Sequence, residues 1–249
     1  GTKELPIKFH SSDSTGGGIF ISNGSEKSTF DYCEFTNLSN PTSDIWELSG
    51  AVNFNESTVA IKNSIFKNNR CEDGLNIIRS KFTLESSIFK DTKSDAFDGD
   101  FVDGTIANCT FINSGNDGVD VSGSKIVLDN IIFENPSDKA ISAGENSAIE
   151  GSKININGGE IGIVSKDLST VLLSDVTIND TRLGFSSFQK KSEFGPGKIT
   201  IKDLKMTNIE SDYLIEIGSS LTIDNIVATT VSNKVIDQMY GKEYGKSSK

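Results

Sequence analysis

Residues 94–124 read SDAFDGDFVDGTIANCTFINSGNDGVDVSGS and contain two copies of one pattern. Asp95 and Asp117 stand 22 residues apart, and Asp98 and Asp120 keep the same spacing. A fixed period of this length is typical of proteins that stack one supersecondary unit on the next. The stretch therefore predicts a solenoid, and it places two pairs of carboxylates on neighbouring units.

The same period extends beyond this stretch in both directions. One apolar column alternates with its sequence neighbours, so we expect it to point inward from a short strand. Its members are Leu75, Phe97, Val119, Ile141, Ile163 and Phe185. We expect a second inward column as well, with a threonine as its polar member. It contains Ile88, Thr110, Ile132, Ile154 and Val176.

A third, polar column is typical of turns. It contains Asn69, Asp91, Asn113, Asn135, Asn157 and Asn179. Asparagine tolerates the left-handed backbone conformation, and stacked side-chain amides can donate hydrogen bonds along the axis. With three short strands in each 22-residue coil, the pattern predicts an all-β chain that forms a right-handed parallel β-helix of about eight to nine coils.

The period also divides the chain into segments. We expect residues 1–18 to be a lead-in or linker, 19–233 to be the β-helix, and 234–249 to be a polar C-terminal tail or cap. An insertion at 40–44, followed by Trp46, is expected in an N-terminal cap, because a solenoid end exposes its apolar cross-section. A longer insertion at 189–197 is expected to form a loop on one face, where function is often found.

Composition excludes several functional classes. The 24 basic and 35 acidic side chains give a net charge of −11, whereas a nucleic-acid partner requires a basic surface. No apolar run approaches the length of about 18–20 residues needed for membrane insertion. Cys33, Cys71 and Cys109 do not follow the coil period, so we expect buried thiols. The only histidine, His10, lies in the lead-in, which argues against a histidine base or a histidine-bound zinc.

Residues 116–124 read NDGVDVSGS and resemble the Asn-Thr-Asp-Gly-x-Asp-x-Ser motif of polygalacturonases. Over residues 19–233 the coil pattern resembles the right-handed parallel β-helices of the pectin-lyase-like superfamily, which contains polysaccharide lyases and glycoside hydrolases. The stretches at 94–100 and 165–167 also resemble β-helix domains attached to bacterial surface proteins. These resemblances imply an extracellular or cell-surface location, a polysaccharide or cell-surface glycan as partner, and a place within a larger chain.

The chain departs from the polygalacturonase pattern at the later motifs. Where that family has an Asp-Asp pair one coil on, this chain has Asp138-Lys139, and its Gly-His-Gly corresponds to Gly159-Glu160-Ile161. The Arg-x-Lys motif corresponds at most to residues 189–191. The resemblance therefore implies a fold and a class of ligand, but an incomplete set of catalytic residues.

The aspartates of adjacent coils are expected to stack on one face. Neighbouring strands lie about 4.8 Å apart, and two carboxylates about 5 Å apart repel by roughly 3 kcal/mol at an effective dielectric constant of about 20. Such a group requires a bound cation, a shared proton or a basic counter-ion. The sequence leaves three interpretations open.

In the first interpretation the face is a solvated acidic turn with salt bridges from Lys139 and Arg79. In the second it holds calcium, the one cofactor that we consider, because calcium prefers oxygen ligands. The candidate calcium ligands are Asp95, Asp98, Asp100, Asp117 and Asp120. In the third, Asp98 and Asp120 form a catalytic pair near the separation found in retaining glycosidases.

A lyase is the alternative catalytic chemistry. It needs a cation to neutralise a uronate and a base to remove the adjacent proton. Lys139 and Lys166 are the candidate catalytic lysines, although a lysine beside carboxylates is a poorer base because its charged form is favoured. The candidate substrate-binding residues are Arg79, Asp117, Lys190, Lys191 and Phe194.

The sequence thus supports two classes of function. One is a carbohydrate-binding or polysaccharide-processing domain, either a lyase or a hydrolase if it is an enzyme. The other is a non-catalytic structural or adhesive module of a larger surface protein. The density of aspartates favours the first class, and the incomplete catalytic motifs favour the second.

Overall fold

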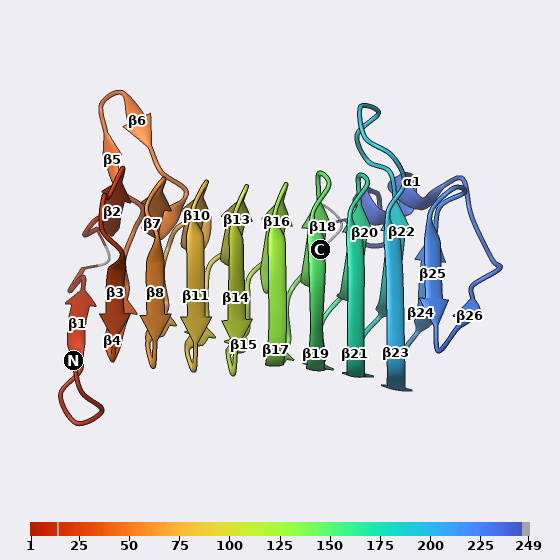
Figure 1. The fold of residues 1–249 in the computed structure, drawn as a ribbon, viewed down its shortest axis with the longest axis horizontal. Coiled ribbons are helices and arrows are strands. Elements are labelled where there is room, and N and C mark those ends of the chain that lie inside the picture. Colours follow the sequence, from red (N-terminus) through yellow and green to blue (C-terminus); the bar gives the residue numbers. More distant parts are fainter. Residues whose placement is uncertain (14, 246–249) are drawn as a thin grey trace.

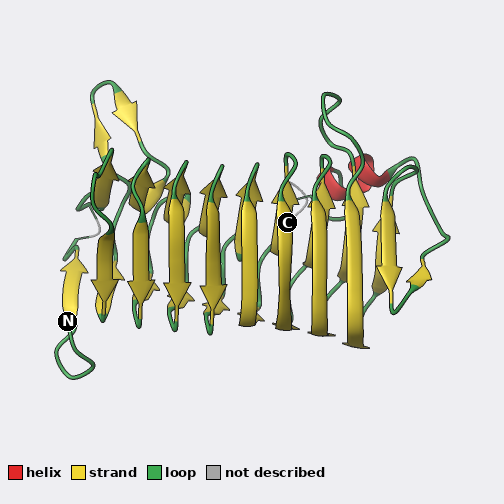
Figure 2. Ribbon diagram, viewed as in Figure 1, coloured by secondary structure: helices red, strands yellow, loops and turns green. Residues whose placement is uncertain are grey.

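The computed structural model describes residues 1–13 and 15–245. The chain winds into stacked coils, and the strands of one coil pair in parallel with the equivalent strands of the next (Figures 1 and 2). The antiparallel pairs are β5 with β6 and β25 with β26. The predicted parallel β-helix is confirmed. Its coils repeat at about the predicted period, since Phe97 pairs with Val119 and Val119 with Ile141.

One face of the solenoid is a nine-stranded sheet with one strand in each coil, counted over the described residues. Its strands, in spatial order, are β2 (Ile19–Ser22), β7 (Gly50–Asn55), β10 (Asp73–Ile78), β13 (Asp95–Asp100), β16 (Val119–Ser122), β18 (Lys139–Gly144), β20 (Ile161–Lys166), β22 (Leu183–Phe188) and β24 (Ser211–Ile215). The candidate site residues lie mainly on this sheet.

A second sheet wraps around the rest of each coil. Within the described part of the chain it has fifteen strands. They are β1 (Ile7–His10), β3 (Ser28–Asp31), β4 (Cys33–Thr36), β8 (Val59–Lys62), β9 (Ile65–Lys67), β11 (Lys81–Glu85), β12 (Ile88–Lys90), β14 (Asp103–Ala107), β15 (Thr110–Ile112), β17 (Lys125–Glu134), β19 (Ala148–Asn157), β21 (Thr170–Asn179), β23 (Lys198–Thr207), β25 (Ser220–Ile223) and β26 (Ile226–Val227).

The second and third strands of a coil merge in the later part of the solenoid. Early coils have two short strands, such as β14 and β15, whereas β17 is one strand of 10 residues. The bend within β17 falls at Asn130, whose φ is 55°. A single residue in the left-handed region turns the chain while the ladder continues on both sides.

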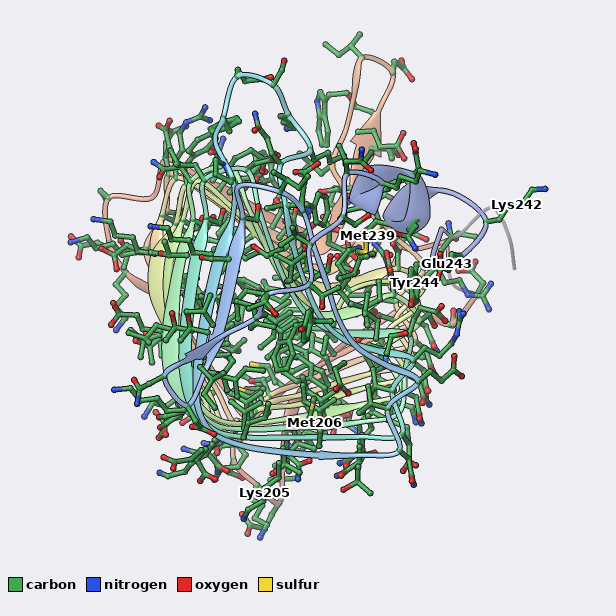
Figure 3. All side chains as sticks on the ribbon, turned by 90° about the vertical axis from the view of Figure 1, so that its right-hand side faces the viewer. Lys205, Met206, Met239, Lys242, Glu243 and Tyr244 are labelled. Atoms are coloured by element: carbon green, nitrogen blue, oxygen red, sulfur yellow. The ribbon has the colours of Figure 1, made fainter. Side chains whose placement is uncertain are left out.

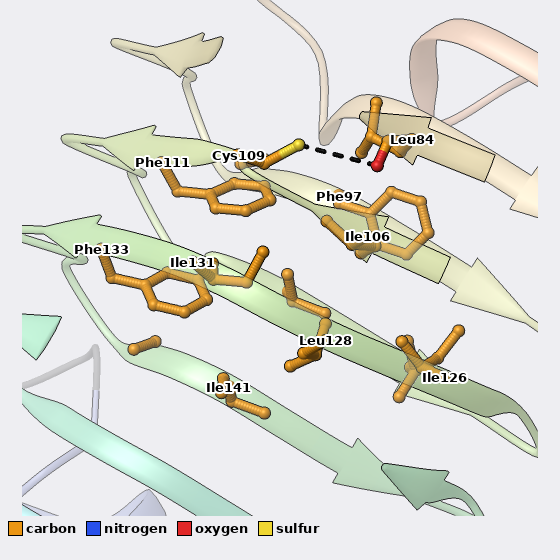
Figure 4. Close-up of a cluster of buried hydrophobic side chains, with 14 of the residues drawn as sticks. Leu84, Phe97, Ile106, Cys109, Phe111, Ile126, Leu128, Ile131, Phe133 and Ile141 are labelled. Carbon is orange, nitrogen blue, oxygen red and sulfur yellow. Dashed lines mark hydrogen bonds between the residues drawn. The ribbon is translucent and has the colours of Figure 1, made fainter. Parts of the chain in front are cut away.

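The interior is filled by the predicted inward column and by a stack of phenylalanine rings. Leu75, Phe97 and Ile141 are completely buried, as expected. Adjacent coils stack Phe66 on Phe89 with ring centroids 4.5 Å apart, and the stack continues through rings of the neighbouring coils. Figure 4 shows part of this core, including the buried thiol of Cys109, which donates to the carbonyl of Leu84. All three cysteines are free and buried, which confirms that prediction.

The second predicted inward column is wrong at its start. The side chain of Ile88 is 40% exposed, while its neighbour Phe89 is buried. The strict spacing also shifts by one residue, because Ile154 pairs with Ile131 and not with Ile132. The cause is an extra residue in the turn after β18, where Glu145 and Asn146 both have positive φ.

The polar ladder at the turn is present, but it is discontinuous. The side-chain amide of Asn113 donates to Asp91 at 2.8 Å, and that of Asn179 donates to Asn157 at 3.1 Å. Asp91 and Asn113 have the expected left-handed conformation, whereas in later coils this conformation moves to Gly158 and Asp180. The turn thus keeps its geometry while the residue that adopts it changes.

Three elements project from the regular coils (Figure 1). The first is a hairpin of β5 (Thr42–Ser43) and β6 (Trp46–Glu47) near the N-terminal coils. The second is the loop 189–197 that follows β22. The third is the helix α1 (Val235–Tyr240), which the polar composition of 234–249 did not predict. None of the described residues forms a helix that is long and apolar enough to span a membrane.

Candidate functional site

The structure brings the predicted aspartates together on the outer side of the nine-stranded sheet. Asp73 pairs in register with Asp95, and Asp98 pairs with both Asn76 and Asp120. Asp100 follows on the same strand as Asp98, and Asp117 directly precedes β16. We call this group the acidic face; its members are Asp73, Asp95, Asp98, Asp100, Asp117 and Asp120.

Two of these aspartates join one coil to the next. A side-chain oxygen of Asp95 accepts a hydrogen bond from the backbone N–H of Asp117 at 2.8 Å. One coil further on, Asp117 accepts from the backbone N–H of Lys139 at 3.0 Å. Both aspartates are buried. Each of these carboxylates therefore accepts a backbone hydrogen bond from the next coil in addition to interacting with neighbouring charges.

Lys139 is held in a buried ion-pair network. Its Nζ lies 2.6 Å from Asp138 and 3.4 Å from Asp117, and its side chain is only 7% exposed. Burial acts to lower the pKa of Lys139, but the charges of Asp117 and Asp138 outweigh it and raise this pKa. Lys139 therefore stays protonated, which suits an ion pair and does not suit a general base.

Lys166 is also buried, but it has fewer partners. Its Nζ donates a hydrogen bond to Ser142 Oγ at 3.0 Å and lies 3.9 Å from Asp120 Oδ1. A Cβ atom at position 144 would lie 2.8 Å from Cε of this lysine, so Gly144 makes room for its stem. Burial tends to lower the pKa of Lys166, and the carboxylate of Asp120 contributes most to raising it. Asp120 thus has a cation beside it.

Asp98 has a different environment from Asp120. It accepts a hydrogen bond from the amide of Asn76 at 2.8 Å, and the pocket that contains Lys139 and Lys166 does not include it. Burial, followed by the charges of Asp73, Asp100 and Asp120, raises the pKa of Asp98 to about 9. Its carboxyl group therefore carries a proton at neutral pH. Two adjacent strands place this acid directly beside Asp120.

The raised pKa values predict that stability falls as the pH rises. Burial raises the pKa of Asp73 to about 7 and that of Asp95 to about 8, as it does for Asp98. Below the unfolded value of 3.8, the folded and unfolded chains bind the same protons. Above it, the folded chain binds more, so the free energy of unfolding should decrease between about pH 4 and pH 9. Thermal melts across this range should show the decrease, and Asp98→Asn should flatten it.

A decrease that is unchanged in Asp98→Asn would contradict the assignment to these aspartates. The matched control is Asp103→Asn, because Asp103 belongs to the same coil but lies exposed on the other sheet. That substitution removes a carboxylate without touching the acidic face, so the slope should stay as in the wild type.

The described residues contain no group of three or more histidine, cysteine, aspartate or glutamate side chains arranged to hold a metal ion. A calcium site on the acidic face remains a prediction. Repeating the thermal melts with a chelator tests it, because an ion that binds only the folded chain raises the melting temperature.

The remaining candidate residues line the edge of the sheet at the loop 189–197. Lys191 pairs with Glu145, and Asp167 accepts hydrogen bonds from the backbone N–H groups of Lys190 and Lys191. This loop borders a pocket of about 550 Å³. Its lining residues are Asp100, Phe101, Ser122, Gly123, Glu145, Asn146, Lys191 and Phe194. Arg79 is exposed and its guanidinium lies 5.3 Å from the ring centre of Phe101.

A second pocket, of about 440 Å³, lies between the acidic face and α1. Asp117, Asp120 and Lys166 line it from the sheet, and Met239 and Tyr240 line it from the helix. We call it the helix pocket. Figure 3, which views the coils from their C-terminal end, shows α1 outside the ring of strands, with Met239 and Tyr244 on that side. The structure therefore adds aromatic side chains to a site that the sequence presented as purely charged.

Sequence reasoning missed the outward-facing ring of Phe20 and its contact with Trp46. Phe20 lies on β2 in the outward column that leads through Asn53 and Asn76 to Asp98. Its ring centre is 6.2 Å from that of Trp46, and both side chains are nearly half exposed. The alternation in Ile19–Ser22 was the available signal for Phe20, since residues on either side of an inward position point outward.

The stacked coils form a parallel β-helix. The chain belongs to the family described as the right handed beta helix region, whose model matches residues 97–236. No curated protein gives a significant match.

Three kinds of solved structure are similar to this chain. A GH87 alpha-1,3-glucanase catalytic domain in complex with nigerose has 13% identity and a TM-score of 0.45, covering 87% of this chain and 57% of that one. The bacteriophage CBA120 tailspike protein 3 has 12% identity and a TM-score of 0.33, covering 90% and 52%. PfbA, a surface adhesin of Streptococcus pneumoniae, has 11% identity and a TM-score of 0.27, covering 86% and 81%.

The chain spans 57% of the length of the glucanase domain.

Proposed function

We propose that the acidic face binds an extracellular polysaccharide and hydrolyses one of its glycosidic bonds. Asp98 is the general acid and Asp120 is its carboxylate partner. One observation carries this proposal: adjacent strands place the two side chains in register, but only Asp120 has a lysine beside it. A pair of carboxyl groups whose environments differ in this way can divide the acid and base roles between them.

The separation of the two strands suits a retaining mechanism. Neighbouring strands lie about 4.8 Å apart, and the two carboxyl groups of retaining glycosidases lie about 5–5.5 Å apart. Asp98 donates its proton to the glycosidic oxygen as the bond to the anomeric carbon breaks, and Asp120 forms a bond to that carbon. Water then attacks the anomeric carbon, Asp98 takes the proton, and the bond to Asp120 breaks.

The buried lysines favour hydrolysis over elimination. A lyase would need Lys139 or Lys166 to act as a neutral base, yet neighbouring carboxylates raise the pKa of both. In a hydrolase the same lysines have a simpler role, since they balance the charge of Asp117 and Asp120. Arg79, Lys190, Lys191 and Phe194 remain candidates for contacts with the glycan at the edge of the sheet.

Phe20 and Trp46 are suited to hold the glycan at the N-terminal end of the face. Both are partly exposed, and aromatic side chains supply large apolar contact areas in ligand sites. Trp46 is the only tryptophan of the chain, so its fluorescence reports on binding at this end.

The test is a panel of soluble α- and β-glucans, pectins, alginates and glycosaminoglycans. Binding is followed by Trp46 fluorescence, hydrolysis by new reducing ends, and elimination by absorbance at 235 nm. We expect new reducing ends without an increase in absorbance at 235 nm. An increase at 235 nm would show a lyase instead.

A substitution pair tests where the glycan binds. Phe20→Ser should weaken binding, because it removes an exposed ring from the outer side of the nine-stranded sheet. Val127→Ser removes a similarly exposed apolar side chain from the other sheet, so binding should stay unchanged. Equal effects of the two variants would argue against binding along the nine-stranded sheet.

The second candidate is a non-catalytic adhesive module of a larger surface protein. It is favoured by the structural use of Asp95, Asp117 and Lys139, which join successive coils. Binding to a glycan of the panel without any product would support this candidate and overturn the catalytic one.

A further inference from the structure

We infer that α1 blocks one end of the glycan-binding outer side of the nine-stranded sheet, so that the site receives the end of a glycan chain and not its interior. This inference rests on the proposed function and concerns which part of the polymer is bound.

The outer side of the nine-stranded sheet changes character where α1 covers it. The column that holds Asp95 and Lys139 continues as Ile161 on β20 and Leu183 on β22. Likewise, Ser142 on β18 is followed by Val164 on β20. In these two columns the outward side chains are thus polar from β13 to β18 and become apolar at β20.

The helix packs on this apolar part. Val235 and Met239 of α1, together with Tyr244 after it, form one buried cluster with Ile161, Val164, Leu183 and Phe188. The burial of these side chains means that α1 covers the outer surface of β20 and β22. A glycan lying along the face therefore meets α1 beyond β18.

Contacts at and just beyond the C-terminal end of the helix fix it in this position. Lys190 Nζ lies 4.5 Å from the ring centre of Tyr240, and the guanidinium of Arg182 lies 5.2 Å from that of Tyr244. Arg182 also donates a hydrogen bond to the backbone carbonyl of Glu243 at 3.2 Å. The two cations come from the loop after β22 and from the turn before it, so the wall is attached to the solenoid on two sides.

The helix pocket has polar atoms suited to the hydroxyl groups of a terminal sugar. Asp120 Oδ1 has no hydrogen-bond partner among the described residues, although it is buried. Lys166 Nζ lies 3.9 Å from Asp120 Oδ1 and donates a hydrogen bond to Ser142. An ammonium group can donate three hydrogen bonds in all. A sugar hydroxyl that enters the pocket beside Asp120 can accept a hydrogen bond from Lys166. The tyrosines of the opposite wall supply the apolar surface.

The position of the acid pair limits the segment that fits beyond the cleaved bond. Asp120 lies on β16 and the wall begins at β20, two strands further on. At about 4.8 Å per strand this is a distance of about 10 Å. Only a short terminal segment fits in that space, so the released product should be short.

The experiment compares long and short fractions of α-1,3-glucan, β-1,3-glucan and homogalacturonan at equal sugar mass. Binding to the full chain is measured by Trp46 fluorescence, and products are sized by chromatography. At equal mass, a fraction with chains ten times shorter has ten times as many ends. If the site binds chain ends, the apparent affinity per mass of glycan should therefore be about tenfold higher for the short fraction than for the long one.

A substitution in α1 tests the wall itself. Met239→Asp places a charge in the buried cluster and should release the helix, so that long chains bind as well as short ones and longer products appear. Ile236→Asp is the matched control, because Ile236 lies on the same helix but is 38% exposed. The control should keep the preference for short chains. The comparison of fractions on the wild-type chain stands whether or not Met239→Asp folds.

Equal affinity per mass for long and short fractions, with products of all sizes, would overturn the inference and leave the proposed function in place. An absence of binding to every fraction and to the wider glycan panel would overturn the proposed function and the inference with it.

Discussion

Replacing Asp98 with asparagine should reduce the rate of glycosidic bond hydrolysis by about 10²–10⁴-fold, the contribution that a general acid typically makes. Asparagine keeps the shape of the side chain but cannot donate the proton to the leaving oxygen. Since the pKa of Asp98 is raised by burial and by neighbouring carboxylates, the neutral amide should leave the melting temperature unchanged or higher at pH 7. Steady-state hydrolysis and thermal melts of the same preparation separate these two effects.

The control for this prediction is again Asp103→Asn, from the same coil. It should retain wild-type turnover, because Asp103 lies on β14 and faces away from the acidic face. A catalytic role for Asp98 is contradicted if the Asp98→Asn variant hydrolyses the polymer at the wild-type rate. It is also contradicted if both variants lose activity equally.

Replacing Lys139 with methionine should destabilise the protein by about 3–5 kcal/mol, the usual cost of removing one partner of a buried ion pair. Methionine fills a similar volume, but it leaves Asp117, which is 2% exposed, without its counter-ion. The loss should be larger at pH 8 than at pH 5. Burial already raises the pKa of Asp117 to about 6 even with Lys139 present, so at lower pH the carboxyl group can take up a proton. Chemical denaturation at the two pH values measures this difference.

A second ion pair supplies the control. Lys153 lies 3.4 Å from Asp129, but both side chains are about half exposed. Exposed pairs contribute about 0–1 kcal/mol, so Lys153→Met should have little effect. The double variant Lys139→Met with Asp117→Asn should recover much of the lost stability, because it removes the unpaired charge. Equal stabilities of Lys139→Met and Lys153→Met would contradict the network.

The architecture could be predicted because its signal is repeated in every coil. Phe97, Val119 and Ile141 each report the same inward position, so one irregular residue does not hide the period. The predicted register was wrong after the turn at Glu145 and Asn146, which contains one extra residue. A fixed spacing does not reveal an insertion of one residue. The grouping of Asp98 with Asp120 followed directly from the same spacing.

The covering helix could not be predicted from its own segment. Within 234–249 only a few apolar residues, such as Val235 and Met239, indicate burial, and a helix of 6 residues carries almost no periodic signal. The stronger signal lay elsewhere, in the change from Lys139 to Ile161 in an outward column. An apolar outward column requires a covering element, but the sequence alone does not show which segment provides it.

The roles of Lys139 and Lys166 could not be predicted from residue spacing, because spacing does not show whether a side chain is buried or ion-paired. Both Lys139 and Lys166 were candidates for catalysis because they continue the acidic columns. Their burial depends on the helix and on the small residues beside them, such as Gly144. Once burial and ion pairing are known, a counter-ion role for Lys139 becomes the simpler interpretation.

A carbon-13 NMR titration of the side-chain carboxyl group tests most directly whether Asp98 is a protonated acid beside Asp120. The wild-type chain is titrated from pH 4 to pH 10, and Asp98→Asn identifies the resonance. The structure predicts that this group titrates with a pKa of about 9, because it is partly buried and lies among other carboxylates. A pKa near 4, the ordinary value for an aspartate, would contradict a protonated Asp98 at neutral pH.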